Sequence, residues 1–334
     1  MKDVLILAIE SSCDETSVAI VKNGCECLEM VTNTQIKTHE LYGGVVPEIA
    51  SRMHAEVITL ILDELWKKVD VTMDDVDAVA VTYAPGLMGS LLVGVEAAKA
   101  LALAFDKPLI AVNHMAGHIY ANNLEQKMEY PLLALVVSGG HTDLLLMNGD
   151  YDFKKLGSTL DDAIGECYDK VARVLGLKYP GGPNIEKMAR EGNFTYNLPV
   201  AMNDDSFNFS FSGLKSNIIN LVHNEKQRGN EIRKADLAYS FQKVAVDQLK
   251  RKVEKAFNNY SVKSFILAGG VSANNYLRQE MTDLAEKYNI KFNVPKFVYC
   301  TDNAAMIGAA AYPLFLQQRF ANYDLNAQSY DEIY

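Results

Sequence analysis

The sequence predicts an α/β protein built from two similar lobes. Continuously apolar runs, typical of buried strands, alternate with stretches whose apolar residues recur at helical spacing, as in α/β folds. A strand–turn–strand pattern at residues 4–21 occurs again at residues 132–147. The 334 residues suffice for one large or two medium domains. We therefore interpret the repeated pattern as a weak internal symmetry, with one copy in each lobe.

The elements of the first lobe follow from its hairpin. Residues 4–10 are continuously apolar up to Glu10, which is typical of a strand buried on both faces, and residues 17–21 form the returning strand. The polar turn between them contains Asp14 and Glu15. The other strands expected in this lobe are 76–82 and 108–112, and the expected helices are 55–69, 91–105 and 115–124.

The second lobe is expected to open with strands 132–137 and 142–147. It should continue with a helix over 156–175, a Gly/Pro break at 176–183, a helix over 235–258 and a strand at 262–268. A helix over 304–315 follows this lobe in the chain. We place the lobes at residues 1–131 and 132–301. The 302–320 helix is expected to return to the first lobe, and residues 321–334 to form a loosely ordered polar tail.

The composition and net charge of the chain exclude several classes of protein. Hydrophobic residues make up 49% and charged residues 22% of the chain, which is typical of globular proteins and excludes a disordered chain. With 32 Lys and Arg against 42 Asp and Glu, the net charge is −10, so the chain alone is a poor binder of nucleic acid. Lys250-Arg251-Lys252 is more simply a solvated helix face than an RNA contact. Five cysteines and the lack of a long apolar run predict a cytoplasmic protein with reduced thiols and no membrane association.

His114-Met-Ala-Gly-His118 is the sharpest candidate site. Histidines four residues apart on a helix lie on one face, a few Å from each other, which suits two metal ligands. Met115 stands where zinc proteases carry their general base, so that chemistry is excluded. Asp302, in a turn before an expected helix, is a plausible third ligand. The simpler alternative is a solvated helix start, and the pair alone does not decide between the two.

Glycine turns beside strands form the second group of candidates. They are Ser138-Gly-Gly-His-Thr142, Gly181-Gly182-Pro183 and Gly269-Gly270-Val-Ser-Ala-Asn274. Glycine lets a ligand approach the backbone, and such turns can hold phosphate or a nucleotide, although hairpins use glycine in any case. Asp14 and Glu15 could coordinate a metal-bound water or act as a base, with a solvated acidic turn as the simpler alternative. The run 209–215 indicates a strand or turn near a ligand.

These motifs, in this order, resemble the TsaD family. The resemblance rests on the following segments: Leu7–Thr16, Tyr42–Arg52, His114-x-x-x-His118, Ser138–Thr142, Tyr179–Pro183, Phe209–Lys215, Gly269–Asn274 and Thr301-Asp-Asn303. It covers roughly residues 4–315, and the Ser-Ser-Cys-Asp-Glu-Thr turn is similar to the bacterial branch. The resemblance implies two duplicated actin/Hsp70/sugar-kinase-like lobes with the active-site cleft between them.

The resemblance also implies an activity. Members of the family transfer a threonylcarbamoyl group from threonylcarbamoyl-AMP to N6 of the adenine just 3′ of the anticodon, in tRNAs that read codons beginning with A. By motif, His114, His118 and Asp302 should bind one divalent metal per subunit, with iron(II) as the first expectation and zinc as the second. The expected substrate-binding residues are Val136, Val137, Ser138, Gly139, Gly140, Asp169, Gly182, Glu186 and Asn274.

Partner molecules and alternative functions can also be expected. The resemblance implies a TsaB-like paralogue in a heterodimer, a TsaE-like ATPase, an upstream threonylcarbamoyl-AMP synthase and tRNA. Asp14 or Glu15 could accept the proton that leaves N6. One alternative is a small-molecule kinase or carbamoyltransferase of the same superfamily, which has no need of the two histidines. Others are a non-catalytic scaffold, which has no need of an intact site, and a metalloprotease, which the missing Glu after His114 disfavours.

Overall fold

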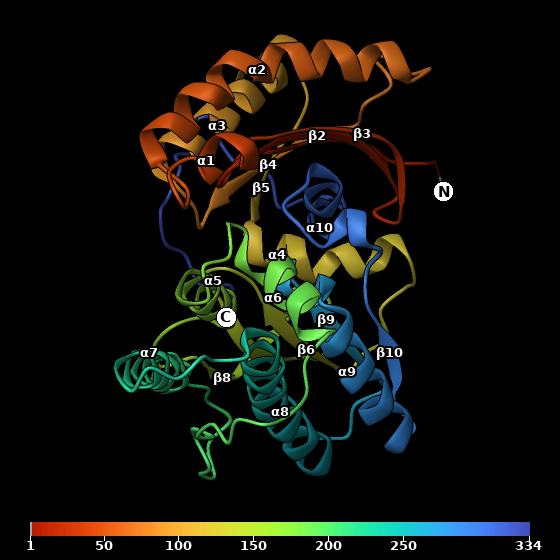
Figure 1. Cartoon of the computed structure of the whole chain (residues 1–334). Coiled ribbons are helices and arrows are strands. Elements are labelled where there is room, and N and C mark those ends of the chain that lie inside the picture. The colour runs from red at the N-terminus through yellow and green to blue at the C-terminus, as the bar shows by residue number, and fades with distance from the viewer. Residues whose placement is uncertain (1) are drawn as a thin grey trace. The chain divides into compact units, whose positions relative to one another are not determined.

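Two five-stranded sheets organise the chain in the computed structural model, which describes residues 2–334 (Figure 1). Each sheet lies in its own unit. Unit 1 comprises residues up to 128 together with Pro295–Tyr334, and unit 2 comprises Glu129–Val294. Residues 321–334, which the sequence predicts as a separate tail, fall within unit 1. No helix among the described residues has both the length and the apolar character needed to cross a bilayer.

The sheet of unit 1 has the order β3-β2-β1-β4-β5. Its strands are β1 (Leu5–Glu10), β2 (Glu15–Lys22), β3 (Glu26–Thr34), β4 (Ala78–Ala84) and β5 (Leu109–Asn113). β1 and β2 form the expected antiparallel hairpin, and β4 and β5 extend the sheet in parallel on the other side of β1. β1 is central and buried, which explains why its sequence is apolar without alternation.

Helices cover both faces of this sheet. They are α1 (Ile36–Glu40), α2 (Pro47–Lys68), α3 (Met88–Ala104), α4 (His114–Tyr120) and α10 (Ala304–Leu316), with short 3-10 turns at Ala121–Leu124 and Phe297–Tyr299. α2 and α3 lie over one face and α10 over the other (Figure 1). Gly308 allows α10 to pack closely, because a Cβ there would lie 2.5 Å from Val21.

Unit 2 repeats the sheet of unit 1. Its strands are β6 (Leu132–Val137), β7 (Thr142–Met147), β8 (Phe153–Ser158), β9 (Ser264–Ala268) and β10 (Lys291–Asn293), in the order β10-β9-β6-β7-β8. The β6–β7 and β7–β8 pairs are antiparallel, whereas β6–β9 and β9–β10 are parallel. Strand order and direction therefore match those of unit 1, and the predicted duplication is confirmed.

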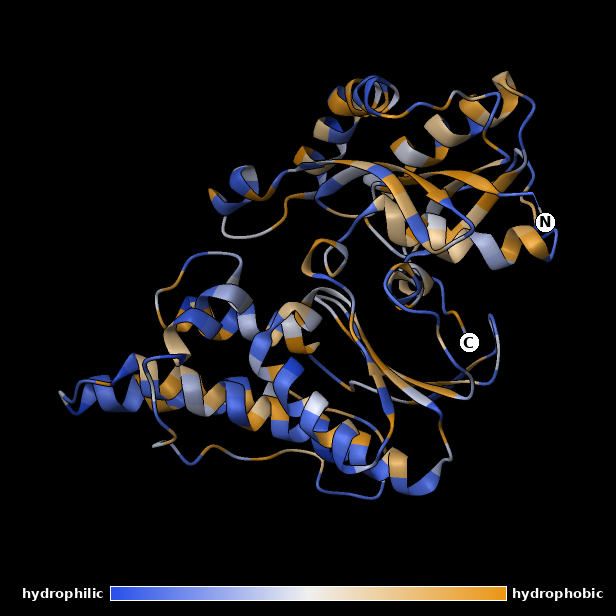
Figure 2. Cartoon of the chain, turned by 90° about the vertical axis from the view of Figure 1, so that its right-hand side faces the viewer, coloured by the Kyte–Doolittle hydropathy of each residue, from blue (hydrophilic) through white to orange (hydrophobic). Residues whose placement is uncertain are grey.

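The core of unit 2 lies between its sheet and a group of helices. These are α5 (Ile164–Val174), α6 (Gly181–Ala189), α7 (Ser212–Gln227), α8 (Lys234–Asn259) and α9 (Asn275–Lys287), with a 3-10 turn at Gly270–Ala273. Side chains from β6 and β9, such as Leu135 and Phe265, pack in one buried cluster with Phe241 of α8. In Figure 2 the strands of both sheets are largely hydrophobic, while the helices of unit 2 contain many hydrophilic residues.

Two sequence predictions in unit 2 are wrong in detail. The helix expected over 156–175 begins only at Ile164, because residues 156–158 belong to the edge strand β8, whose Gly157 and Ser158 pair with β7. The Gly/Pro break expected at 176–183 already contains the first turn of α6. Gly181 opens that helix, and its N–H donates to Asp169 Oδ1 at 2.6 Å.

The tail of the chain packs on unit 1, so the expectation that it is loosely ordered is wrong. Ala321 forms a β-bridge with Leu109 of β5. The side chain of Ala327 is buried, and the Gln328 N–H donates to the Tyr83 carbonyl at 2.8 Å. Backbone groups at the open edge of the sheet thus find partners in a segment whose own sequence is polar.

Candidate metal centre and ligand-binding turns

The two histidines are placed by a strand-to-helix junction. β5 ends at Asn113, whose side-chain Oδ1 accepts a hydrogen bond from the Met115 N–H at 2.8 Å and so caps α4. His114 is the first residue of α4, and His118 lies one turn later on the same face. Asp302 precedes α10, which Asn303 caps in the same way through the Met306 N–H at 3.0 Å. All of these residues belong to unit 1.

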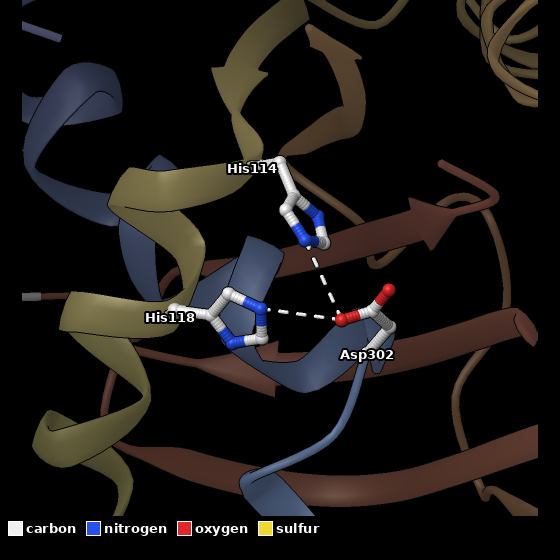
Figure 3. A group of neighbouring side chains, drawn as sticks. All are labelled: His114, His118 and Asp302. Atoms are coloured by element: carbon white, nitrogen blue, oxygen red, sulfur yellow. Dashed lines mark ion pairs between the residues drawn. The ribbon is translucent and has the colours of Figure 1, made fainter. Parts of the chain in front are cut away.

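The three side chains converge (Figure 3). Oδ1 of Asp302 lies 3.4 Å from Nε2 of His114 and 3.2 Å from Nε2 of His118. The imidazole centroids are 4.6 Å apart and the rings are nearly perpendicular. One ligand atom from each residue lies within 4.8 Å of the others. Two neutral nitrogens and one carboxylate oxygen on one side of a cation are a donor set that suits iron(II) or zinc.

Electrostatics at this cluster reflect its burial. Desolvation alone would raise the pKa of Asp302, but the adjacent His114 and His118 hold it well below its usual range. Desolvation would lower the pKa of His114, yet Asp302 and Glu10 raise it well above its usual value. The imidazoles and carboxylates therefore compensate one another when no cation is bound. A divalent cation would replace the proton of His114, which fits the residues that are present.

Glu10 is a functional candidate that the sequence analysis missed. It is fully buried at the end of β1, and its Oε2 lies 3.1 Å from Nδ1 of His114. The Thr82 hydroxyl donates to the same oxygen at 2.6 Å, and the Ser12 N–H donates to Oε1 at 2.5 Å. A carboxylate that accepts the Nδ1 proton orients the ring and leaves Nε2 free for a metal. The sequence feature that could have indicated it is a charged residue at the end of an otherwise apolar strand.

Asp14 and Glu15 are buried, so the simpler interpretation of a solvated turn is wrong. Their exposed fractions are 7% and 8%. The turn is held by α2, because Nε2–H of His54 donates to the Cys13 carbonyl at 2.9 Å and the Thr16 hydroxyl lies 2.7 Å from Nδ1 of His54. Burial, followed by the charges of Asp302 and Asp14, raises the pKa of Glu15 to about 10. In the metal-free chain Glu15 is therefore protonated at neutral pH.

Two of the glycine turns, at residues 138–140 and 269–270, lie side by side at the ends of the paired strands β6 and β9. Gly269, after β9, has φ +86°, and a Cβ there would lie 2.5 Å from the Val137 carbonyl oxygen. The Gly165 N–H at the start of α5 donates to the Ser138 carbonyl at 3.2 Å. Gly139 and Gly140 face open space, since an added Cβ on either would have no neighbour within 4 Å. The 138–140 turn thus leaves backbone accessible to a ligand.

The other predicted substrate-binding residues also belong to unit 2. Val136 and Val137 are buried in β6, so only their backbone can contact a ligand. Asp169 already binds the N–H of Gly181, and burial raises its pKa.

Glu186 and Asn274 lie on the neighbouring helices of unit 2. Glu186 accepts a hydrogen bond from the Asn275 side chain at 2.7 Å, and Asn274 donates to Gln242 at 3.0 Å while capping α9. An added Cβ on Gly182 would meet nothing within 4 Å. The metal candidates and Asp14 and Glu15 are in unit 1, whereas the substrate-binding set is in unit 2.

The basic run on α8 is structural. The Lys252 ammonium is buried and donates to the Ser206 carbonyl at 2.8 Å and to the Asp204 carboxylate at 2.9 Å. Lys250 pairs with Glu280, and Arg251 donates to Asn203. The interpretation of this run as a solvated helix face is therefore wrong, because these cations fasten loops and a helix of unit 2.

Comparison with known proteins identifies the family. A family model described as TsaD, tRNA N6-adenosine threonylcarbamoyltransferase, matches residues 26–309. The chain belongs to the TsaD family. tRNA N6-adenosine threonylcarbamoyltransferases from Staphylococcus aureus strains Mu3 and N315 are each 52% identical to this TsaD chain over 329 residues, which cover 98% of it and 96% of the relative. The predicted transferase class is thereby confirmed.

Solved structures support the fold of this TsaD chain. Full-length HypF in its phosphate- and nucleotide-bound form superposes with a TM-score of 0.64 at 14% identity, over 94% of this chain and 47% of HypF. The activator of 2-hydroxyisocaproyl-CoA dehydratase from Clostridium difficile, with bound ADPNP, gives a TM-score of 0.51 at 13% identity, over 96% and 99%. At these identities the likeness concerns the fold alone. The predicted α/β fold with two similar lobes is confirmed.

Proposed function

We propose that this TsaD chain transfers the threonylcarbamoyl group of L-threonylcarbamoyl-AMP to N6 of the adenine just 3′ of the anticodon, in tRNAs that read codons beginning with A. AMP is the leaving group. The observation that carries the proposal is the convergence of His114, His118 and Asp302, in a chain that belongs to this family. A paralogue that only binds a partner has no need of such a cluster.

The reaction needs activation because N6 of adenine is a weak nucleophile, whose lone pair is delocalised into the ring. The mixed anhydride of the donor supplies a good leaving group. A divalent cation held by His114, His118 and Asp302 would supply Lewis acidity. Iron(II) is our first choice and zinc the second, with one ion per subunit.

The residues of unit 2 bind and orient the donor. Backbone N–H groups of the 138–140 turn are placed to hold phosphate or the developing oxyanion. Asp169, Glu186 and Asn274, with the backbone of Gly182 and of Val136 and Val137, surround ribose and base. Holding donor and acceptor in one geometry supplies much of the rate. Asp14 is the better candidate for accepting the N6 proton, because Glu15 keeps its own proton at neutral pH in the metal-free chain.

Partners are part of the proposal. The chain has a net charge of −10, and the cations of the 250–252 run are engaged within unit 2. A bulky tRNA therefore needs help to bind, which a TsaB-like paralogue in a heterodimer and a TsaE-like ATPase would provide. An upstream synthase would supply threonylcarbamoyl-AMP. A cytoplasmic location accords with a tRNA substrate.

The test is a reconstituted modification assay. The chain is incubated with unmodified tRNA, threonine, bicarbonate, ATP and the companion enzymes, and the nucleosides are then analysed by mass. We expect threonylcarbamoyladenosine with the natural chain and its loss with His118→Ala. His223→Ala is the matched control, because His223 is exposed on α7. Phosphorylation of a small molecule without the modified nucleoside would instead support a kinase, and full modification by His118→Ala would contradict the proposed metal centre.

A further inference from the structure

The segment after α10 contacts the strand-to-helix junction that carries the histidines. Asp331 accepts a hydrogen bond from the Tyr83 hydroxyl of β4. The same carboxylate oxygen accepts from Nδ2 of Asn113 at 3.2 Å, and the Asp331 carbonyl oxygen also lies 3.3 Å from that nitrogen. The carbonyl oxygen and one carboxylate oxygen of Asp331 thus both hold the side-chain amide of Asn113.

That amide belongs to the residue that caps the histidine helix. Asn113 is 7% exposed, and while its Nδ2 donates to Asp331, its Oδ1 accepts from the Met115 N–H at 2.8 Å. Asn113 also directly precedes His114 in the chain. Its side-chain orientation therefore determines where α4 begins and in which direction His114 leaves the backbone.

The contact is anchored on both sides. Gln328 donates to the Tyr83 carbonyl, and the side chain of Ala327 is buried against unit 1. Tyr83 is fixed within β4, which pairs with β1 and β5. Residues 327–331 therefore form a strap, held by the sheet at one end and by Asn113 at the other. Without the Asp331 carboxylate the buried Asn113 amide keeps only the residue 331 carbonyl, at 3.3 Å, as its acceptor in this strap, and is free to turn away from the cap.

We propose that Asp331 is a positioning residue of the metal centre, which acts through Asn113 to hold His114 and His118 in ligating geometry. The inference rests on the metal centre of the proposed function. It adds that the segment at residues 327–331, which carries no motif, contributes to metal affinity.

The experiment measures metal affinity directly on the full chain. Zinc affinity is determined by competition with a chromophoric chelator, and the cobalt(II) complex is followed by its visible absorption. Asp331→Ala should weaken zinc binding about 10-fold and alter the cobalt spectrum, as expected for loss of an outer partner of a metal ligand. Asp331→Asn keeps an oxygen acceptor for the Asn113 amide and should restore most of the affinity. Asp324→Ala changes an exposed residue between α10 and residues 327–331, and should leave affinity and spectrum unchanged.

A truncated chain and a double variant test whether Asp331 acts through Asn113. Removal of residues 329–334 should reproduce the effect of Asp331→Ala, because Gln328 and its bond to Tyr83 remain. In an Asn113→Ser background, which keeps a cap acceptor, Asp331→Ala should have little additional effect if the two residues act together. Equal affinity of the natural chain and of a folded Asp331→Ala would overturn the inference, as would full additivity with Asn113→Ser. A natural chain that binds no metal would instead overturn the metal centre of the proposed function.

Discussion

At the scale of single residues, the proposed metal centre depends on groups that contact the candidate ligands. Glu10 is the clearest of them, because it is buried and lies 3.1 Å from Nδ1 of His114. Removing it leaves that ring without its carboxylate partner, although Ser12 Oγ, at 3.1 Å, stays within reach. Glu10 therefore sets both the tautomer and the direction of the ring.

We predict that Glu10→Ala weakens zinc binding about 10- to 100-fold, the range typical of lost outer partners of metal ligands. The measurement is the same chelator competition. Thr82→Val is the control, since it removes one hydrogen bond to Glu10 but keeps the carboxylate on His114. Unchanged affinity in a folded Glu10→Ala would show that Ser12 alone is enough to orient the ring.

The raised pKa of Glu15 predicts a pH-dependent stability. In the unfolded chain this carboxyl ionises near pH 4.5, whereas in the folded chain it keeps its proton up to about pH 10. The folded state thus binds more protons, so Glu15 makes stability fall as pH rises between these values. In chelator, Glu15→Gln should be more stable than the natural chain by about 1–3 kcal/mol at pH 7, and equal to it near pH 4.

Urea unfolding at several pH values measures this difference. Glu56→Gln, an exposed change on α2, should leave the pH dependence as it is. In the modification assay Glu15→Gln should retain turnover, because a protonated carboxyl is no proton acceptor. A stability difference that does not vary with pH would contradict the assignment.

The sequence alone points to the three candidate ligands, but it does not show the residues that support them. His114 and His118 are recognisable because their spacing on one helix is local, and Asp302 because the motif order resembles a family. Glu10 finds its partners in Thr82 and His114, which are far away in the chain, so no local pattern shows them. The burial of Asp14 and Glu15 likewise comes from His54 and other residues outside the turn.

At the scale of elements, the glycine turns of unit 2 can be separated by experiment. Gly269 has a positive φ, and a Cβ there would clash with the Val137 carbonyl, whereas Gly270 beside it has open space in the direction of a Cβ. Gly269→Ala should therefore cost about 2 kcal/mol or more of unfolding free energy and displace the 138–140 turn.

Gly270→Ala is the matched control and should change stability by less than about 0.5 kcal/mol. Urea unfolding measures both. Because Gly269 supports the turn that is proposed to hold phosphate, AMP binding by calorimetry should weaken in Gly269→Ala. Equal stability of the two variants would show that the turn adjusts without cost.

The expected elements that proved wrong share one cause. Residues 156–158 have apolar spacing compatible with a helix, but pairing with β7 makes them a strand. The polar segment 321–331 has no pattern of its own and is held by Leu109 and Tyr83. The hairpins, in contrast, could be predicted because both strands and the turn are adjacent in the sequence.

At the scale of the whole molecule, the two units share one sheet topology but carry different candidate functional groups. The proposed metal ligands are in unit 1, and the glycine turns are in unit 2. Metal should therefore stabilise unit 1 selectively. In scanning calorimetry, a chelator should lower the transition of unit 1 and leave that of unit 2 in place.

The size of this effect follows from mass action. Metal at about 100 times its dissociation constant stabilises the state that binds it by about 2.7 kcal/mol. His118→Ala should abolish the response to metal, whereas His223→Ala should keep it. A metal-dependent shift of the unit 2 transition, with unit 1 unchanged, would contradict the assignment of ligands.

The order of the ligands along the chain has a consequence for biosynthesis. Unit 1 is interrupted by Glu129–Val294, so His114 and His118 leave the ribosome well before Asp302 does. A nascent chain therefore exposes two imidazoles that lack their carboxylate until unit 2 has been translated. The proposed three-ligand site can therefore be completed only after residue 302 has been translated, which would couple metallation to completion of the polypeptide.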